Sequence, residues 1–290
     1  MRNTQYFKAL WLGAALFTFA ALGVETPASS TAVVAPVSKP AKWIAGIEIR
    51  PSFVIPGDEY NTQNYAQMGY QLGSGAQFVF RQEFRTNLYN PKLAPGGDGM
   101  HLSTDDAFFR ARVNDVYALT GSLSLNYEGR LYLPTNAQKR DAGMITAMRN
   151  YARFRAKLSP TLSLFVEEIP ILHAYSQPGA IVRGKAEANP IVENRVVLAA
   201  EWVFASQWKL FFPLTMRSTR YRDYAPKAKH NDAWAHKLYF WPEVVYALSP
   251  TLSLGAAFMT ESLVKADFSD LNFAESLKRG TAQIILSAQL

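Results

Sequence analysis

Apolar and polar residues alternate along most of the chain from residue 43 onward. Residues 123–133 show the pattern most clearly, because mostly apolar odd positions alternate with Ser124, Asn126, Glu128 and Arg130. Side chains of a β-strand point to opposite faces in turn, so this period predicts strands with one apolar and one polar face. The pattern predicts about twelve strands, at residues 43–54, 65–72, 78–85, 108–119, 123–133, 145–158, 162–168, 195–204, 209–217, 237–248, 252–261 and 280–290.

A six-residue sequence, Ser-Pro-Thr-Leu-Ser-Leu, occurs twice, at 159–164 and at 249–254. Proline presets φ for a tight turn and serine often opens one, so each copy predicts a hairpin turn followed by a strand. Weaker turn signals lie at 73–75, 120–122 and 205–207. The centres of these five turns are 39 to 47 residues apart. A spacing this regular indicates a repeating structural unit.

Each repeating unit contains two long strands, one tight turn and one long polar loop. A propeller blade of similar length needs four short strands, whereas transmembrane barrels alternate short periplasmic turns with longer outer loops. We therefore predict an all-β fold over residues 43–290. It is a closed antiparallel transmembrane β-barrel of about twelve strands with six longer extracellular loops. The turns at 159–161 and 249–251 are expected to face the periplasm, and the charged loop at 220–234 the outside.

The alternation breaks once inside a strand, at the sequence Glu-Ile-Pro of residues 168–170. Proline has no N–H group for the ladder, so it is found at bulges and sheet edges. The break therefore predicts a bulge or the rim of the barrel near Pro170.

Residues 1–42 do not alternate. Arg2 and Lys8 accompany an apolar stretch at 9–22 that is too short to span a bilayer comfortably as a helix, and small residues follow. We predict a secretory signal peptide at 1–23, with a second cleavage position as late as residue 28; an uncleaved anchor is the alternative. Residues 24–42, rich in Pro, Ala, Ser and Thr, are predicted to be a disordered periplasmic linker.

Composition narrows the possible classes of protein. The chain has 290 residues, no cysteine, a net charge of +7 and a mean hydropathy of −0.08. This hydropathy excludes a bundle of membrane-spanning helices but not a barrel, whose lipid-facing and lumen-facing residues average out. The positive charge suits an anionic ligand, nucleic acid or lipid headgroups. Because no nucleic-acid motif is found and the cations are spread over the strands, we expect no nucleic-acid partner.

The polar face of the predicted strands is rich in arginine and glutamate. Four of five consecutive same-face positions within 145–158 carry cations, and such a face cannot contact lipid. Arginine binds carboxylates and phosphates, and rings of arginine favour anion passage. We predict a passive diffusion channel, or porin, that favours small anionic solutes. Its predicted pore-lining residues are Arg81, Arg85, Arg110, Arg112, Arg130, Arg149, Arg153, Arg155, Arg195, Arg217, Glu83, Glu128, Glu201 and Glu243.

Two other functions stay open. Arginine and glutamate side chains that pair across strands could fill a closed structural or adhesive barrel. His173 and Ser176 would suit a hydrolase, but catalysis also needs a third group that orients the base, and the sequence does not supply it. We predict no catalytic residue and no cofactor.

Metal binding has little support in the sequence. The four histidines, at 101, 173, 230 and 236, lack the spacing of metal ligands. Asp98, Asp105 and Asp106 are weak candidates for a divalent ion in a loop, and no metal site is predicted.

Several aromatic residues lie near expected strand ends and are predicted to anchor the barrel at the membrane interface. They are Tyr127, Trp202, Trp208, Phe212 and Tyr246.

The leader, the hairpin period and the last amphipathic strand resemble those of bacterial outer-membrane β-barrel proteins. In that group the last strand often carries a glycine, alternating apolar residues and a terminal aromatic. Gly280, Ile284, Leu286 and Leu290 follow this outline, although Leu290 stands where a phenylalanine is usual. The resemblance covers about residues 43–290. It implies the cell outer membrane of a Gram-negative bacterium, with the lipid bilayer, lipopolysaccharide and the barrel-assembly machinery as partners.

The predicted size is also similar to that of the monomeric twelve-stranded channels for acidic oligosaccharides, which have arginine-lined pores. A twelve-stranded outer-membrane phospholipase family has a similar size too. Its pattern of His, then Ser, Asn and Gly, does not occur around His173, so no catalytic residue is carried over from it.

Overall fold

The computed structural model describes residues 43–54, 60–72, 75–89, 101–120, 122–182, 184–264 and 280–289. All of them belong to one compact unit, Pro40–Leu290. The predicted signal peptide at 1–23 and linker at 24–42 lie outside the described residues, as do Asp98 and Leu290.

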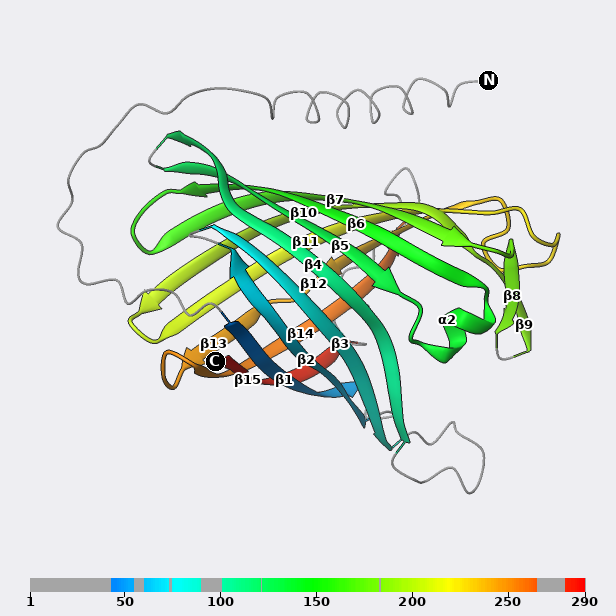
Figure 1. The fold of residues 1–290 in the computed structure, drawn as a ribbon, viewed down its shortest axis with the longest axis horizontal. Helices are drawn as coiled ribbons and strands as arrows, with labels where there is room; N and C mark the ends of the chain where they lie inside the picture. Colours follow the sequence, from blue (N-terminus) through cyan, green and yellow to red (C-terminus); the bar gives the residue numbers. More distant parts are fainter. Residues whose placement is uncertain are drawn as a thin grey trace. The chain divides into compact units, whose positions relative to one another are not determined.

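The described residues are almost entirely β-strand, with one short helix (Figure 1). No helix among them is long and apolar enough to cross a membrane. The elements are β1 (Trp43–Val54), β2 (Tyr60–Leu72), β3 (Ala76–Tyr89), β4 (His101–Thr120), β5 (Leu123–Leu133), α2 (Ala137–Asp141), β6 (Met144–Lys157), β7 (Leu162–Tyr175), β8 (Gly179–Val182), β9 (Lys185–Ala188), β10 (Pro190–Ala205), β11 (Trp208–Tyr221), β12 (Trp234–Phe240), β13 (Glu243–Ala247), β14 (Leu252–Val264) and β15 (Thr281–Gln289).

The large sheet closes on itself. Neighbouring strands pair antiparallel, and β1 pairs with both β2 and β15. β12 and β13 both pair with β11 and β14, so they are two halves of one strand interrupted at Trp241 and Pro242. The ring therefore has twelve strands, and the predicted closed antiparallel barrel is confirmed. β8 and β9 form a separate hairpin outside the ring.

The repeated six-residue sequence forms the same turn in both places. Ser159 Oγ accepts the backbone N–H groups of Thr161 and Leu162 at 3.2 and 3.0 Å. Ser249 Oγ accepts the corresponding groups at 3.2 and 3.1 Å. These tight turns lie at one end of the barrel, and α2 with the β8–β9 hairpin lies at the other (Figure 1).

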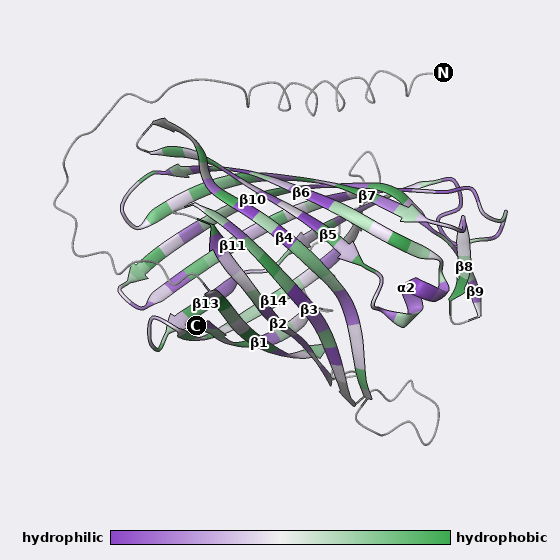
Figure 2. Cartoon of the chain, in the orientation of Figure 1, coloured by the Kyte–Doolittle hydropathy of each residue, from purple (hydrophilic) through white to green (hydrophobic). Residues whose placement is uncertain are grey.

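The banded colours of Figure 2 show hydrophilic and hydrophobic residues alternating along the strands, which gives the two faces of the ring different chemistry. The polar face is the concave one, because Arg50 on β1 reaches Glu243 on β13 at 3.9 Å although β15 and β14 separate these strands around the ring. The opposite face carries exposed apolar side chains, among them Ile49, Leu198 and Ile284. Apolar side chains therefore face outward, as a surface in contact with lipid requires.

Two local predictions were wrong. The Glu-Ile-Pro break neither ends a strand nor forms a bulge, because β7 continues through Pro170 to Tyr175 in unbroken register with β10. The strand predicted at 237–248 is instead divided by Pro242, which has no N–H group for the ladder. Two predicted loops also contain structure: α2 lies in the loop after β5, and β8 and β9 lie in the loop after β7.

Candidate functional site

Three arginines stand side by side on the inner face, in one rung of the sheet. Arg110 on β4 pairs in register with Arg130 on β5, and Arg130 pairs with Arg149 on β6. We call these three residues the arginine row. Like charges directly opposite each other destabilise a sheet, so the row needs compensating partners.

Aromatic rings supply part of that compensation. The Arg130 guanidinium lies 4.9 Å from the ring centre of Phe108 and 4.3 Å from that of Tyr151. Arg149 lies 4.1 Å from the ring centre of Tyr132. A guanidinium over a ring face is attracted by the negative charge of that face. The rings cover the flat faces of the guanidinium groups, so their N–H edges are left for other partners.

Carboxylates supply little compensation in the arginine row. Arg130 pairs with Glu128 at 2.5 Å, and Glu128 is shared with Arg112 at 3.7 Å. Among the described residues, no ion pair joins Arg110 or Arg149 to a carboxylate, and the Nε of each is buried without a hydrogen-bond partner. Beside the row, Arg81 binds the amide oxygen of Gln67 instead of a carboxylate, at 2.7 Å. This region of the lumen therefore holds more cationic than anionic side chains.

A second rung of cations crosses the opposite part of the ring. Arg195 on β10 pairs in register with Arg217 on β11, and Arg217 pairs with Lys237 on β12. We call these three the paired row, because each has a carboxylate partner. Glu193, with a side chain only 1% exposed, lies 2.5 Å from both Arg195 and Arg217. Lys237 forms an ion pair with Glu261.

The remaining predicted residues also lie on the inner face, and most of them are paired. Arg153 meets Glu167 at 2.8 Å, and Arg155 reaches past β7 to Glu201 on β10 at 2.6 Å. Arg85 lies 3.5 Å from Asp105. Glu83 lies on the same face of β3 as Arg81 and Arg85. Glu243 completes this set through its contact with Arg50.

Sequence reasoning missed Glu193 as a residue of the inner face. It lies two positions before Arg195, so the alternation already placed it on the polar face of the same strand. The prediction began that strand at residue 195, and β10 in fact starts at Pro190.

Specific contacts hold the described loops around α2 at one end of the barrel. Lys139 of α2 forms an ion pair with buried Asp106 on β4, and Asn136 donates to Asp105 at 2.9 Å. Buried Asn189 donates to the carbonyls of Ala142 and Gln177 at 2.8 and 3.0 Å, so it joins two loops. Asp105 and Asp106, two of the weak candidates for a divalent ion, are thus held by amide and cationic groups. No group of three candidate ligands occurs in the described part of the chain.

His173 and Ser176 do not contact each other through any hydrogen bond in the described structure. The Ser176 hydroxyl donates to the carbonyl of Gly143 at 3.1 Å. Both ring nitrogens of His173 are buried without a partner among the described residues. The geometry needed for an activated serine is therefore not assembled here.

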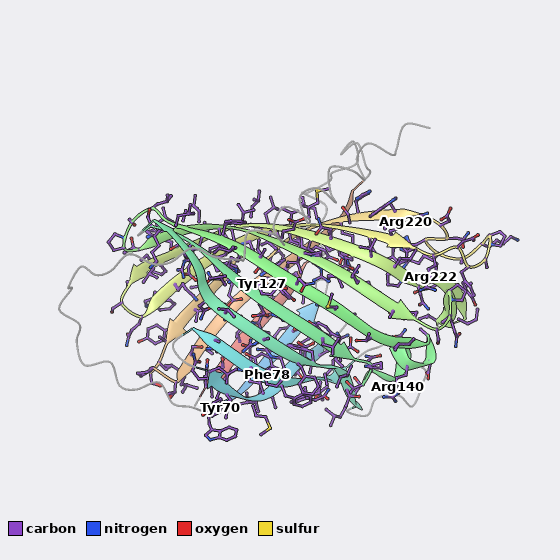
Figure 3. The ribbon with its side chains drawn as sticks, turned by 45° about the horizontal axis from the view of Figure 1, so that its top comes forward. Tyr70, Phe78, Tyr127, Arg140, Arg220 and Arg222 are labelled. Atoms are coloured by element: carbon purple, nitrogen blue, oxygen red, sulfur yellow. The ribbon has the colours of Figure 1, made fainter. Side chains whose placement is uncertain are left out.

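Different residues lie toward the two ends of the barrel (Figure 3). Arg140, Arg220 and Arg222 lie toward the loop end, and Tyr70, Phe78 and Tyr127 toward the turn end. Of the predicted interface aromatics, Trp208 and Tyr246 pack together with ring centres 4.7 Å apart, and Trp202, Phe212 and Tyr127 are exposed. Trp202 and Trp208 flank the turn at 205–207, and aromatic residues near strand ends are typical of a membrane interface.

No known protein-family model and no curated protein matches the chain. Solved structures do match its fold. An outer membrane channel from Pseudomonas putida F1 is 13% identical, with a TM-score of 0.58, over 89% of this chain and all of that one. The NanC porin is 12% identical, with a TM-score of 0.51, over 84% of this chain and all of that one. The fold is therefore that of an outer-membrane β-barrel of the porin type.

Proposed function

We propose that this protein is an outer-membrane diffusion channel that favours small anionic solutes. The observation that carries the proposal is the arginine row, in which two of three guanidinium groups have no carboxylate partner among the described residues. A mobile anion in the lumen is then the natural counter-ion. A cationic wall in a narrow, low-dielectric lumen raises the local concentration of anions.

Exposure of the inner face supports an open lumen. The inward side chain of Arg85 is 42% exposed, and those of Arg112 and Arg153 are each 33% exposed. A lumen filled by its own side chains would bury these groups. This observation favours a channel over the closed structural or adhesive barrel. Because no hydrogen bond joins His173 and Ser176 in the described structure, the geometry gives no support to a hydrolase.

The partners belong to the same proposal. The outward apolar face suits the lipid bilayer of the outer membrane, and the cations Arg140 and Arg222 at the loop end suit the phosphates of lipopolysaccharide. Delivery to that membrane would follow from the predicted signal peptide and the barrel-assembly machinery.

The test is the reversal potential of the purified protein in a planar bilayer under a KCl gradient. The parent channel should prefer chloride. Replacing Arg110 and Arg149 together by glutamine should lower the anion-to-cation permeability ratio by about two- to threefold, because the unpaired cations are removed. An unchanged ratio in an open channel would refute the role of the arginine row, and no conductance in the parent would favour the closed barrel.

A charge-neutral pair provides the matched control. Arg153→Gln combined with Glu167→Gln removes one cation and its carboxylate partner, which lie 2.8 Å apart. The net charge of the lumen does not change, so the permeability ratio should stay close to that of the parent. A large change in this control would mean that pore shape rather than charge sets the selectivity.

A further inference from the structure

The outer face carries a polar patch at the level where lipid contact is expected. Glu168 is the seventh of the fourteen residues of β7, and its register partners Ala152 and Val196 lie on the outward face. Asn194 on β10 donates to it at 3.5 Å, and Asn150 on β6 accepts the Tyr127 hydroxyl at 2.6 Å. We call Asn150, Glu168 and Asn194 the outer polar patch.

Apolar side chains flank the patch along the strands that carry it. On β7, Val166 is 46% exposed on the turn side and Leu172 is 52% exposed on the loop side. Met148 on β6 and Leu198 on β10 are exposed in the same way. The patch is thus surrounded by apolar surface and does not mark the edge of the apolar band.

Lipid chains offer these polar groups no partner. The Glu168 side chain is partly exposed on the outward face, and its one hydrogen bond among the described residues is the long contact to Asn194 at 3.5 Å. A polar group facing hydrocarbon without a partner is unfavourable, and a carboxylate on the lipid face more so. The outer polar patch therefore calls for a polar partner within the membrane.

We propose that the partner is a second copy of this chain, joined across a two-fold axis at the outer polar patch. The patch holds both kinds of group that such an interface needs: the amide N–H donors of Asn150 and Asn194, and the carboxylate acceptor of Glu168. An isologous interface uses the same surface on both subunits, so that surface must complement itself. Donors of one copy then meet acceptors of the other.

An apolar hollow lies next to the patch on the same face. It has a volume of about 470 Å³, and its lining includes Phe154, Leu164, Val166, Leu198 and Phe212. In the proposed dimer, apolar side chains of the partner fill this hollow beside the polar contact. A central polar cluster bordered by packed apolar side chains gives both register and contact area to an interface.

The absence of cysteine from the sequence allows a direct test by cross-linking. Val166→Cys places a thiol beside the patch, and Ile284→Cys places one on an exposed outward position of β15, far around the ring. A membrane-permeant bifunctional maleimide is applied to cells that express each variant. We expect a cross-linked dimer for Val166→Cys and only monomer for Ile284→Cys.

Variants of the patch then test its part in the contact. In the Val166→Cys background, Glu168→Leu with Asn194→Leu should lower the cross-linked fraction by roughly tenfold. Glu168→Gln, which keeps a hydrogen-bonding group, should preserve most of it. Each variant is also labelled with a monofunctional maleimide to show that its thiol is accessible. An accessible but uncross-linked Val166→Cys, or a cross-link that survives the double leucine change, would overturn the proposal.

Discussion

The arginine row and the paired row each place three cations in register on neighbouring strands of the inner face. The positive charges of the two rows are neutralised in different ways. In the paired row, Glu193 is buried between Arg195 and Arg217, so the protein carries its own counter-ion. In the arginine row, ring faces cover Arg130 and Arg149, and Arg110 is 8% exposed without a carboxylate partner among the described residues. Carboxylates of the protein neutralise the paired row, whereas two cations of the arginine row have no carboxylate partner among the described residues.

This difference separates the structural and functional roles of inward cations. A carboxylate that bridges two arginines fixes the register of their strands and cancels their charge. An arginine supported by aromatic rings keeps its position and also its charge. The number of arginines on a barrel face is therefore a poor measure of selectivity, which depends on those without an internal counter-ion.

The largest effect is expected from removing the shared counter-ion of the paired row. Glu193→Gln leaves Arg195 and Arg217 opposite each other without compensation. Because both arginines are partly exposed, the free energy of unfolding should fall by about 2 kcal/mol, below the range for fully buried pairs. Urea unfolding in lipid vesicles measures it. Glu201→Gln, at a more exposed carboxylate, is the control with the smaller loss.

A second change gives the region of the arginine row a counter-ion that it lacks. Gln67→Glu is nearly isosteric and converts the amide that binds Arg81 into a carboxylate. Anion preference should fall by somewhat less than twofold, because one unpaired cation is neutralised while the fold is retained. Reversal potentials measure it. A fall of equal size after Gln77→Glu would show that any added negative charge has the same effect and that the pairing of Arg81 is irrelevant.

The aromatic support of the arginine row is expected to contribute less. Tyr151→Leu removes the ring that lies 4.3 Å from the Arg130 guanidinium. The free energy of unfolding should fall by about 1 kcal/mol, the size of a partly exposed cation–π contact. Urea unfolding tests this, with Tyr151→Phe as the control that keeps the ring. If the two variants lose the same stability, the hydroxyl rather than the ring face supports Arg130.

The smallest effect concerns the loop beyond the paired row. Burial, together with the nearby charges of Lys229 and Lys237, lowers the pKa of His230, whose ring stacks on Tyr221 at 4.6 Å. A lowered pKa means that the folded loop favours the neutral ring. This contribution is present above about pH 6.5 and is lost as the pH falls through the folded pKa. Limited proteolysis of the loop should therefore speed up in acid, and His230→Gln should weaken that dependence.

Local pattern was enough to predict the barrel. Alternation reports which residues share a strand face, because the two-residue period is a property of the backbone itself. The repeated turns at Ser159 and Ser249 showed where hairpins begin and end. Each hairpin contributes two strands, so the predicted number of strands was even. The inner face was found in the same way, as the set of arginine and glutamate positions that cannot face lipid.

Which charged side chains form ion pairs could be seen only in the closed ring of the tertiary structure. Arg155 and Glu201 are 46 positions apart in the sequence, and their contact depends on the register of three strands. The same holds for Glu193 between its two arginines, for the division of the strand at Pro242 and for the outward position of Glu168. Sequence fixes the side of the sheet on which a residue lies, because that depends on its immediate neighbours. Its partner depends on strand register around the ring, which is set by the packing of the whole barrel.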